Sequence, residues 1–194
     1  GVGPLAGTNV PTSGRSTVTF ISPATNMYGK ANVGGHWGGE LKYAGYDNIV
    51  VHGASENPVY LQIHDGEARL REASHLWGKT VGETDSRIKK ELQDRDYRIA
   101  CIGPAGENKV RFAAIINSCD NAMGRGGAGA VMGSKKLKAI AVRGTGDVNV
   151  ADPDKFWEVT LQAIRDLAND SGAKTLHAYG TSGFVEAVNE AHAY

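Results

Sequence analysis

The chain has 194 residues, of which 41% are hydrophobic and 22% charged, proportions that are ordinary for a soluble globular protein. Its formal net charge is zero, so no global field would attract nucleic acid or an anionic membrane, and neither is expected as a partner. No apolar run reaches the ~18 residues of a membrane span and no secretory signal pattern opens the chain, so a cytoplasmic protein is expected. Cys101 and Cys119 lack metal-ligand spacing, which favours buried neutral thiols over a disulfide or a cysteine-held cluster.

Glycine use changes along the chain. It has 26 glycines, and those that follow residue 150 are Gly172, Gly180 and Gly183. This break predicts a turn-rich β domain over residues 1–150 and the start of a helical region over 151–194. Because the chain begins without Met and ends within a helical pattern, we expect it to be part of a longer protein.

The first 14 residues are rich in glycine and proline turns and lead to a strand predicted over Ser16–Ile21. Arg15 stands where the last turn meets this strand, a position that is suited to contact with a ligand. A surface arginine beside a turn is the open alternative, because arginine is mostly exposed in proteins.

A second extended segment, Met27–Asn32, leads into Gly34-Gly35-His36-Trp37-Gly38-Gly39. Two glycine pairs would let a flat ligand lie against the backbone, and Asn32 offers an oxygen and an amide for a cation or a heteroatom. A β-bulge that places Trp37 in the core is the alternative.

The next segments predict a short helical turn and an antiparallel meander, since apolar residues alternate with polar ones and Asp65-Gly66 signals a hairpin. Charged residues around the hairpin predict a solvated sheet face. The expected elements are a helical turn at Glu40–Gly45 and extended segments at Asn48–Val51, Pro58–Ile63 and Ala68–Arg71.

Further elements follow the same patterns of hydrophobic periodicity and turn residues. We expect an amphipathic helix over Thr80–Gln93 and strands at Arg98–Ile102, Val110–Ile116 and Ala139–Val142. Asp152 and Pro153 predict the start of a helix that continues to Asn169, and a second helical pattern follows Gly183.

The most distinctive segment is Ala122–Gly133, in which Arg125 is the only charge among many glycines. Glycine is used where a positive φ is required or where no side chain fits between the main chain and a ligand. Arginine presents a planar fork of donors for phosphate or a heterocycle edge, and free backbone N–H groups before a helix would add an anion site. A tight turn with close helix packing is the plainer alternative.

Gly124, Gly126 and Gly129 have the G-x-G-x-x-G spacing of a dinucleotide-binding loop. The preceding strand is too distant, the following helix is short, and no acidic residue ends the next strand, so that assignment is not supported. The phosphate-loop pattern also fails. The residues support a narrower reading, in which the segments around Arg15, Asn32–Gly39 and Asn121–Arg125 form a bed for an anionic, flat cofactor.

Several longer motifs occur in order between residue 1 and about residue 150. They are Gly3-Pro4-Leu5-Ala6-Gly7-Thr8, Pro11-Thr12-Ser13-Gly14-Arg15, Ala31-Asn32-Val33-Gly34-Gly35, Glu40-Leu41-Lys42-Tyr43-Ala44-Gly45-Tyr46-Asp47, Ala73-Ser74-His75-Leu76-Trp77-Gly78, Ile102-Gly103-Pro104-Ala105-Gly106-Glu107-Asn108 and Gly124–Gly133 with Leu137-Lys138-Ala139-Ile140-Ala141-Val142. Together they resemble the N-terminal domain of the tungsten-containing aldehyde:ferredoxin oxidoreductase family. Later residues resemble the start of the family's helical domain.

This resemblance implies an α+β fold in which two antiparallel sheets, here without the N-terminal strands, form a saddle under a tungsten bis-pyranopterin (molybdopterin-type) cofactor. It implies oxidation of a small aldehyde to the carboxylic acid with water. Two electrons would pass through a 4Fe-4S cluster to ferredoxin or an electron-transfer subunit. The cluster ligands and the catalytic acid and base groups belong to later domains, so this chain should not catalyse alone. An oligomer is expected.

The resemblance also assigns roles by position. Arg15 would lie between the pterin and the cluster. Asn32 and Ala122 would give oxygens to a magnesium ion that bridges two pterin phosphates, since a divalent cation between phosphates prefers oxygen ligands. The other residues that would line the pterins are Gly34, Gly35, Asn121, Gly124 and Arg125.

The chain departs from the family pattern at two places. Asn121 stands where relatives carry an arginine, so a charge contact to a pterin phosphate is lost or is shared with Arg125. His36-Trp37 replaces other aromatic pairs on the substrate side. A tungsten-dependent reductase of an aromatic thioester, of the benzoyl-CoA type, and a flavin- or nucleotide-binding module of a larger complex remain as alternatives.

Overall fold

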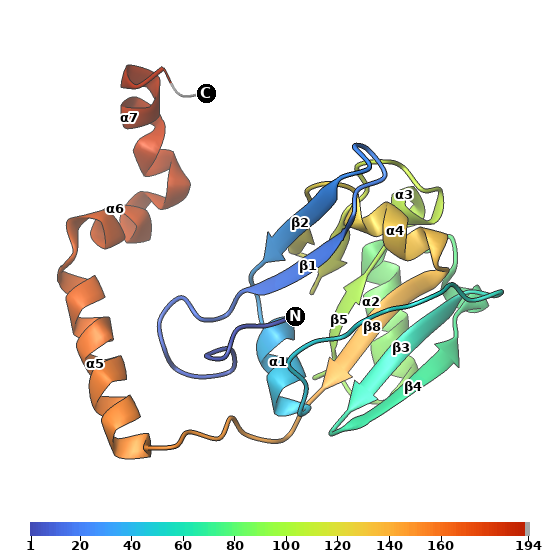
Figure 1. The fold of residues 1–194 in the computed structure, drawn as a ribbon, viewed down its shortest axis with the longest axis horizontal. Helices are drawn as coiled ribbons and strands as arrows, with labels where there is room; N and C mark the ends of the chain where they lie inside the picture. Colours follow the sequence, from blue (N-terminus) through green and yellow to red (C-terminus); the bar gives the residue numbers. More distant parts are fainter. Residues whose placement is uncertain (193–194) are drawn as a thin grey trace. The chain divides into compact units, whose positions relative to one another are not determined.

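The computed structural model describes residues 1–192 and divides into two compact units. The first unit comprises Gly1–Thr8 and Thr12–Val148, and the second comprises Asn9–Pro11 and the chain from Asn149 onwards. Figure 1 shows that the first unit contains the sheets and that the second is helical. The fold is α+β, as the sequence predicted.

Two sheets build the first unit. Strands β1 (Ser16–Ile21) and β2 (Tyr28–Val33) form an antiparallel pair in which Ser16 faces Val33 and Ile21 faces Tyr28. The second sheet has six strands in the order β4-β3-β8-β5-β6-β7. Its strands are β3 (Val59–His64), β4 (Glu67–Glu72), β5 (Arg98–Cys101), β6 (Ile115–Asn117), β7 (Asn121–Met123) and β8 (Leu137–Arg143).

The larger sheet is mixed rather than wholly antiparallel, because β3 and β8 pair in parallel. The chain passes through several intervening elements between these two strands, so no hairpin fixes their relative direction. The helical segments of this unit are α1 (Trp37–Tyr43), η1 (Ser74–Leu76), α2 (Val81–Glu91), α3 (Pro104–Glu107) and α4 (Ala128–Ser134).

Alternating side chains of β8 separate the core into two layers. Ile140 and Val142 pack with α1, α4 and the β1–β2 pair, whereas Ala139 and Ala141 pack with the buried side chains beneath α2. Alternation of this kind is what a strand covered on both faces requires. The β1–β2 pair therefore lies over one face of the larger sheet, and α2 covers the other (Figure 1).

Several predicted elements are confirmed. The strand at Ser16–Ile21 has the predicted bounds, and α2 begins after Thr80, which forms a capping box with Glu83. In the second unit, α5 (Pro153–Asn169) begins where predicted, and the Asp152 side chain accepts from the Lys155 N–H at 3.0 Å. The unit continues with α6 (Ser171–Tyr179), which the sequence did not predict, η2 (Gly180–Phe184) and α7 (Val185–Glu190).

Two predicted strands are wrong. Asn48–Val51 forms no strand, and Val50 and Val51 are exposed. Of Val110–Ile116, only the last residues are extended, because the Ala113 carbonyl accepts from the Gly129 N–H of α4 at 2.9 Å instead of pairing with a strand. Tertiary packing against a helix overrides the apolar pattern here.

The second glycine pair of the Gly34–Gly39 segment serves packing, not a ligand. Helix α1 begins at Trp37, earlier than predicted, and contains Gly38, where an added Cβ would lie 2.3 Å from Ser16 Oγ. Trp37 is buried and donates to the Ile140 carbonyl at 3.3 Å. The alternative that places Trp37 in the core is therefore correct, although it enters on a helix and not on a β-bulge.

The cysteines differ from each other. Cys101 is buried, and burial raises the pKa of its thiol to about 12. Cys119 is exposed on the turn between β6 and β7, which corrects the expectation that both thiols are buried. Within residues 1–192, no helix combines the length and the apolar character that crossing a bilayer needs.

Candidate functional site

The candidate residues lie on the outer face of the β1–β2 pair and on the chain beside it. Strand alternation leaves Tyr28, Lys30 and Asn32 exposed on one face of β2, while the residues between them are buried. Asn32 faces Thr17 across the pair, and its Oδ1 accepts from the Thr17 hydroxyl at 2.9 Å. Lys30 shares the exposed face of β2 with Asn32, as its two-residue spacing from Asn32 requires.

Gly34 and Gly35, which follow β2, lie beside Asn121, the first residue of β7. Gly35 has φ +84°, and an added Cβ would lie 2.9 Å from Asn121 Nδ2. At Gly34 an added Cβ would be 3.9 Å from Asn121 Oδ1. The left-handed backbone at position 35 thus favours glycine, and a side chain there would also have to displace the Asn121 amide. The structure brings together two predicted segments that are far apart in the sequence.

Arg15, which directly precedes β1, lies beside the same corner. An added Cβ at Gly14 would lie 3.9 Å from the Gly35 carbonyl, so the backbone that carries Arg15 lies beside the glycine pair. Arg15 itself is exposed. The corner therefore combines main chain from Gly14–Arg15, Gly34–Gly35 and Asn121.

The glycine-rich segment after β7 divides into two parts with different roles. Its second part serves packing, as the plainer alternative proposed. Added Cβ atoms would lie 3.1 Å from Phe20 at Gly126, 2.1 Å from the Arg111 carbonyl at Gly127, 2.4 Å from the Ala114 carbonyl at Gly129 and 1.9 Å from the Gly106 carbonyl at Gly133. The Gly129 N–H donates to the Ala113 carbonyl, so this N–H at the start of α4 is not free to bind an anion.

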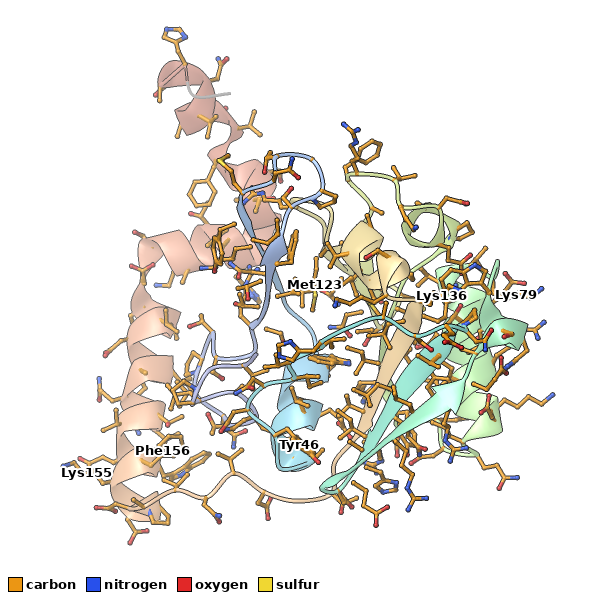
Figure 2. The ribbon with its side chains drawn as sticks, turned by 45° about the vertical axis from the view of Figure 1, so that its right-hand side comes forward. Tyr46, Lys79, Met123, Lys136, Lys155 and Phe156 are labelled. Atoms are coloured by element: carbon orange, nitrogen blue, oxygen red, sulfur yellow. The ribbon has the colours of Figure 1, made fainter. Side chains whose placement is uncertain are left out.

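The first part of the segment is open. Ala122, Gly124 and Arg125 are exposed, and an added Cβ at Gly124 would meet only the Ala122 Cβ, at 3.9 Å. Met123, between them, points inward and is 5% exposed (Figure 2). From Ala122 to Arg125, every residue except Met123 is thus exposed, and the segment is open to a ligand.

The two candidate arginines lie toward opposite ends of β1. Gly126, next to Arg125, accepts from the Ser22 hydroxyl at 2.8 Å, just after β1 ends, whereas Arg15 precedes its first residue. The six residues of β1 span about 20 Å. A ligand that contacts both arginines must therefore be long, and one anionic group near each end would match their charges.

The site has no cluster of acidic or thiol ligands. Within residues 1–192, no three His, Cys, Asp or Glu side chains are grouped in a way that could hold a metal ion. A metal ion bound by this unit would therefore depend on amide or main-chain oxygens and on ligand atoms, which suits a hard divalent cation.

An apolar cavity of about 450 Å³ lies along β1 and is lined by side chains of α1, α4 and the larger sheet, among them Trp37, Leu41 and Met132. Among the residues that the structure describes, no candidate site residue lines it. The cavity nevertheless adjoins the candidate site, because it is lined by Met123 and by Thr17, whose hydroxyl donates to Asn32.

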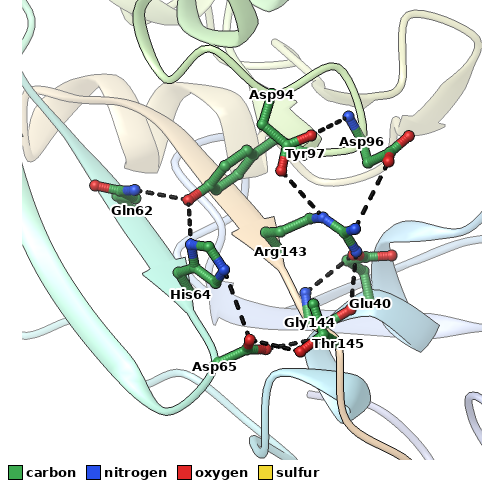
Figure 3. Close-up of polar contacts among 10 residues, drawn as sticks. All are labelled: Glu40, Gln62, His64, Asp65, Asp94, Asp96, Tyr97, Arg143, Gly144 and Thr145. Carbon is green, nitrogen blue, oxygen red and sulfur yellow. Dashed lines mark hydrogen bonds and ion pairs between the residues drawn. The ribbon is translucent and has the colours of Figure 1, made fainter.

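A polar cluster at the end of β8 holds α1 in place (Figure 3). Arg143 Nη1 donates to Glu40 Oε1 at 3.0 Å, and the Gly144 N–H donates to the same oxygen at 3.0 Å. The hydrogen bond that Arg143 donates to Glu40 is the main cause that raises the pKa of Arg143. Because α1 begins shortly after Gly34 and Gly35, this cluster also helps to hold that part of the candidate site in position.

Comparison with known proteins agrees with this fold. A family profile described as "Aldehyde ferredoxin oxidoreductase, N-terminal domain" matches residues 1–144. The tungsten-containing aldehyde ferredoxin oxidoreductase of Thermococcus kodakarensis is 54% identical over 189 residues, which are 97% of this chain and 31% of that protein. The Pyrococcus abyssi protein of the same name is 52% identical, with the same coverage.

A solved structure is also similar. The active site complex BamBC of benzoyl coenzyme A reductase, in complex with 1,5-dienoyl-CoA, has a TM-score of 0.82 and 43% identity. The similarity covers 84% of this chain and 25% of that one.

These findings define the first unit as the N-terminal domain of a family of oxidoreductases. The chain belongs to the aldehyde ferredoxin oxidoreductase family, and residues 1–144 correspond to the family's N-terminal domain. It spans about a third of the length of the curated relatives named above.

Proposed function

We propose that this chain is the cofactor-binding part of a tungsten-dependent enzyme that oxidises aldehydes to carboxylic acids and passes electrons to ferredoxin. The names of its relatives support the reaction class. The observation that carries the proposal is the corner where Gly35 has a left-handed backbone and its Cβ position lies 2.9 Å from Asn121 Nδ2, so that an added side chain would displace that amide. Exposed main chain at this corner continues to Arg125 and matches a large anionic ligand.

The residues present fit a tungsten bis-pyranopterin with two phosphate groups. Arg15 and Arg125 would each contact one end of the cofactor, and Gly34, Gly35, Asn121 and Gly124 would line it. Asn32 and Ala122 would give oxygens to magnesium, which would reduce repulsion between the phosphates. When bound, the cofactor supplies the two-electron chemistry at tungsten.

The proposal extends beyond the residues of this chain. Residues 1–150 would form the saddle for the cofactor, and residues 151–194 would begin the helical part. The 4Fe-4S cluster and the catalytic acid and base groups would lie outside this chain, and ferredoxin or an electron-transfer subunit would be the partner. A cytoplasmic location and an oligomeric state remain predictions.

The test is Arg125→Ala in the full-length protein, with Arg87→Ala on the exposed face of α2 as the matched control. Tungsten by mass spectrometry and released pterin by fluorescence should both fall in Arg125→Ala, while far-UV circular dichroism stays unchanged. Full tungsten and pterin content in Arg125→Ala would reject its role as a cofactor ligand.

The similarity to the benzoyl coenzyme A reductase complex favours a second candidate, reduction of an aromatic thioester. The purified protein should be assayed with an aldehyde and a ferredoxin-type acceptor, and separately with an aromatic thioester and a low-potential donor. Turnover of the thioester alone would replace the first proposal. Flavin in place of tungsten and pterin would instead identify a flavin-binding module.

A further inference from the structure

We infer that Asn117 is a positioning residue that holds the Gly34–Gly35 corner against β7, a role that rests on the proposed function. No sequence motif distinguishes Asn117, the last residue of β6. Its side chain is fully buried, at 0% exposure. It has no surface for direct contact with a ligand, so any effect on the site must act through the groups it bonds.

Both ends of the Asn117 amide are used. Its Nδ2 donates to the Gly34 carbonyl at 3.0 Å, and its Oδ1 accepts from the Ser118 hydroxyl at 2.7 Å. Burial of an amide is unfavourable unless its polar atoms form hydrogen bonds. The two hydrogen bonds therefore offset the cost of burying the Asn117 side chain. The amide joins the loop after β2 to the turn after β6.

The strand that carries Asn117 is itself anchored. Asn117 pairs with Ala100 of β5, a buried strand of the larger sheet, and with Asn121 of β7 on its other side. The Gly34 carbonyl is therefore attached, through one side chain, to the central part of the fold.

The turn between β6 and β7 is unusual. Ser118 and Cys119 have φ of 52° and 67°, a left-handed backbone that residues other than glycine rarely adopt. The Ser118 N–H donates to the Ile99 carbonyl at 3.0 Å, and its hydroxyl donates to Asn117. These bonds hold the turn that sets where Asn121 begins β7.

The consequence concerns the distance between two proposed cofactor contacts. Gly35 lies close to both amides, since an added Cβ would be 3.1 Å from Asn117 Nδ2 and 2.9 Å from Asn121 Nδ2. Asn117 bonds the glycine loop directly and sets Asn121 through the turn. Without its N–H₂ group, the Gly34 carbonyl loses its partner and the two segments are free to separate.

The test is Asn117→Asp in the full-length protein. The new carboxylate has nearly the same shape, but it cannot donate to the Gly34 carbonyl and repels it. The matched control is Asn108→Asp, because Asn108 Nδ2 also donates to a main-chain carbonyl, that of Pro104, at 2.9 Å, in an exposed loop. Ser118→Ala, which removes only the hydroxyl bonded to Asn117 Oδ1, is a milder second variant.

The readouts are tungsten per chain, the tungsten(V) electron paramagnetic resonance spectrum of the metal retained, and the melting temperature. Because partners that orient the ligands of a metal site typically change affinity by about tenfold or more, we expect Asn117→Asp to lower tungsten content by about threefold or more. The spectrum of the remainder should change, whereas Asn108→Asp should match the parent in both.

Unchanged tungsten content and an unchanged spectrum in folded Asn117→Asp would overturn the inference. If Asn117→Asp does not fold, Ser118→Ala decides: an altered spectrum or a lower tungsten content supports the role, and parental values for both overturn it. A parent protein without tungsten or pterin would reject the proposed function, and the inference with it. A loaded parent with unaffected variants would reject the inference alone.

Discussion

Arg143 and Glu40 form an ion pair at 3.0 Å that joins the last residue of β8 to α1. Their side chains are 23% and 10% exposed, so the pair is largely shielded from solvent. Glu40 also accepts from the Gly144 N–H, and Arg143 also donates to Asp94 Oδ2 at 3.2 Å. The pair thus connects the helix beside the candidate site to the central strand of the larger sheet.

Replacement of Arg143 by Met should leave the Glu40 carboxylate nearly buried without its charge partner. We expect a loss of about 2 kcal/mol in the free energy of unfolding, between the values for exposed and for buried pairs. Urea denaturation measures it. Arg69→Met is the control, because the Arg69–Glu67 pair is exposed on both sides and should be worth less than about 1 kcal/mol.

Gly35→Ala separates backbone strain from occupation of the site. Gly35 and Gly66 have φ of +84° and +85°, but an added Cβ meets Asn121 at Gly35 and nothing within 4 Å at Gly66. Both alanine variants should lose about 1 kcal/mol of stability from the left-handed backbone. Only Gly35→Ala should also lower tungsten content in the full-length protein, and equal content in the two variants would contradict the site.

The stability contributed by Asp65 should depend on pH. Hydrogen bonds from the Thr145 hydroxyl and then from its N–H lower the pKa of Asp65 below the ordinary value of 3.8. A carboxyl with a lower pKa when folded contributes stability above its unfolded pKa and loses it as the pH falls through the folded pKa. Thr145→Val should therefore be less stable than the parent at pH 7, and the difference should shrink below pH 3.8. Urea unfolding at several pH values measures it, and a difference that is constant with pH would contradict the prediction.

Cys101 should resist alkylation. Burial raises the pKa of its thiol to about 12, so almost no thiolate exists at neutral pH. In the intact protein, iodoacetamide at pH 8 should leave Cys101 unmodified, as measured by peptide mass spectrometry, and should modify it after denaturation in guanidinium. Modification at equal rates in the folded and the denatured protein would contradict the burial of this thiol.

Local patterns predicted the elements that depend on short-range chemistry. The start of α5 at Asp152-Pro153 was predicted correctly because a cap needs only the next three or four residues. The failure at Val110–Ile116 has a long-range cause, since the Ala113 carbonyl bonds Gly129 of α4. Apolar alternation alone cannot show which partner a backbone carbonyl will find.

The buried pair of Lys138 and Glu107 shows the same limit. Lys138 is 0% exposed, donates to the Lys79 carbonyl at 2.9 Å and forms an ion pair with Glu107, which also accepts from the Gly78 N–H at 2.8 Å. In the sequence, Lys138 reads as an ordinary charge at the start of a strand. Its burial depends on three segments that only the fold brings together.

The sequence by itself determined the α+β class, the family resemblance and the segments from which a cofactor site would be built, because these follow from residue type, spacing and motif order. Only the tertiary structure decided which glycines serve packing and which remain open, since that depends on what lies opposite each Cα. Likewise, only the tertiary structure identifies Asn117, because its proposed role depends on a hydrogen bond to Gly34, 83 residues away in the chain. Contacts over such distances are made by the packing of the sheets and leave no periodic trace in the sequence.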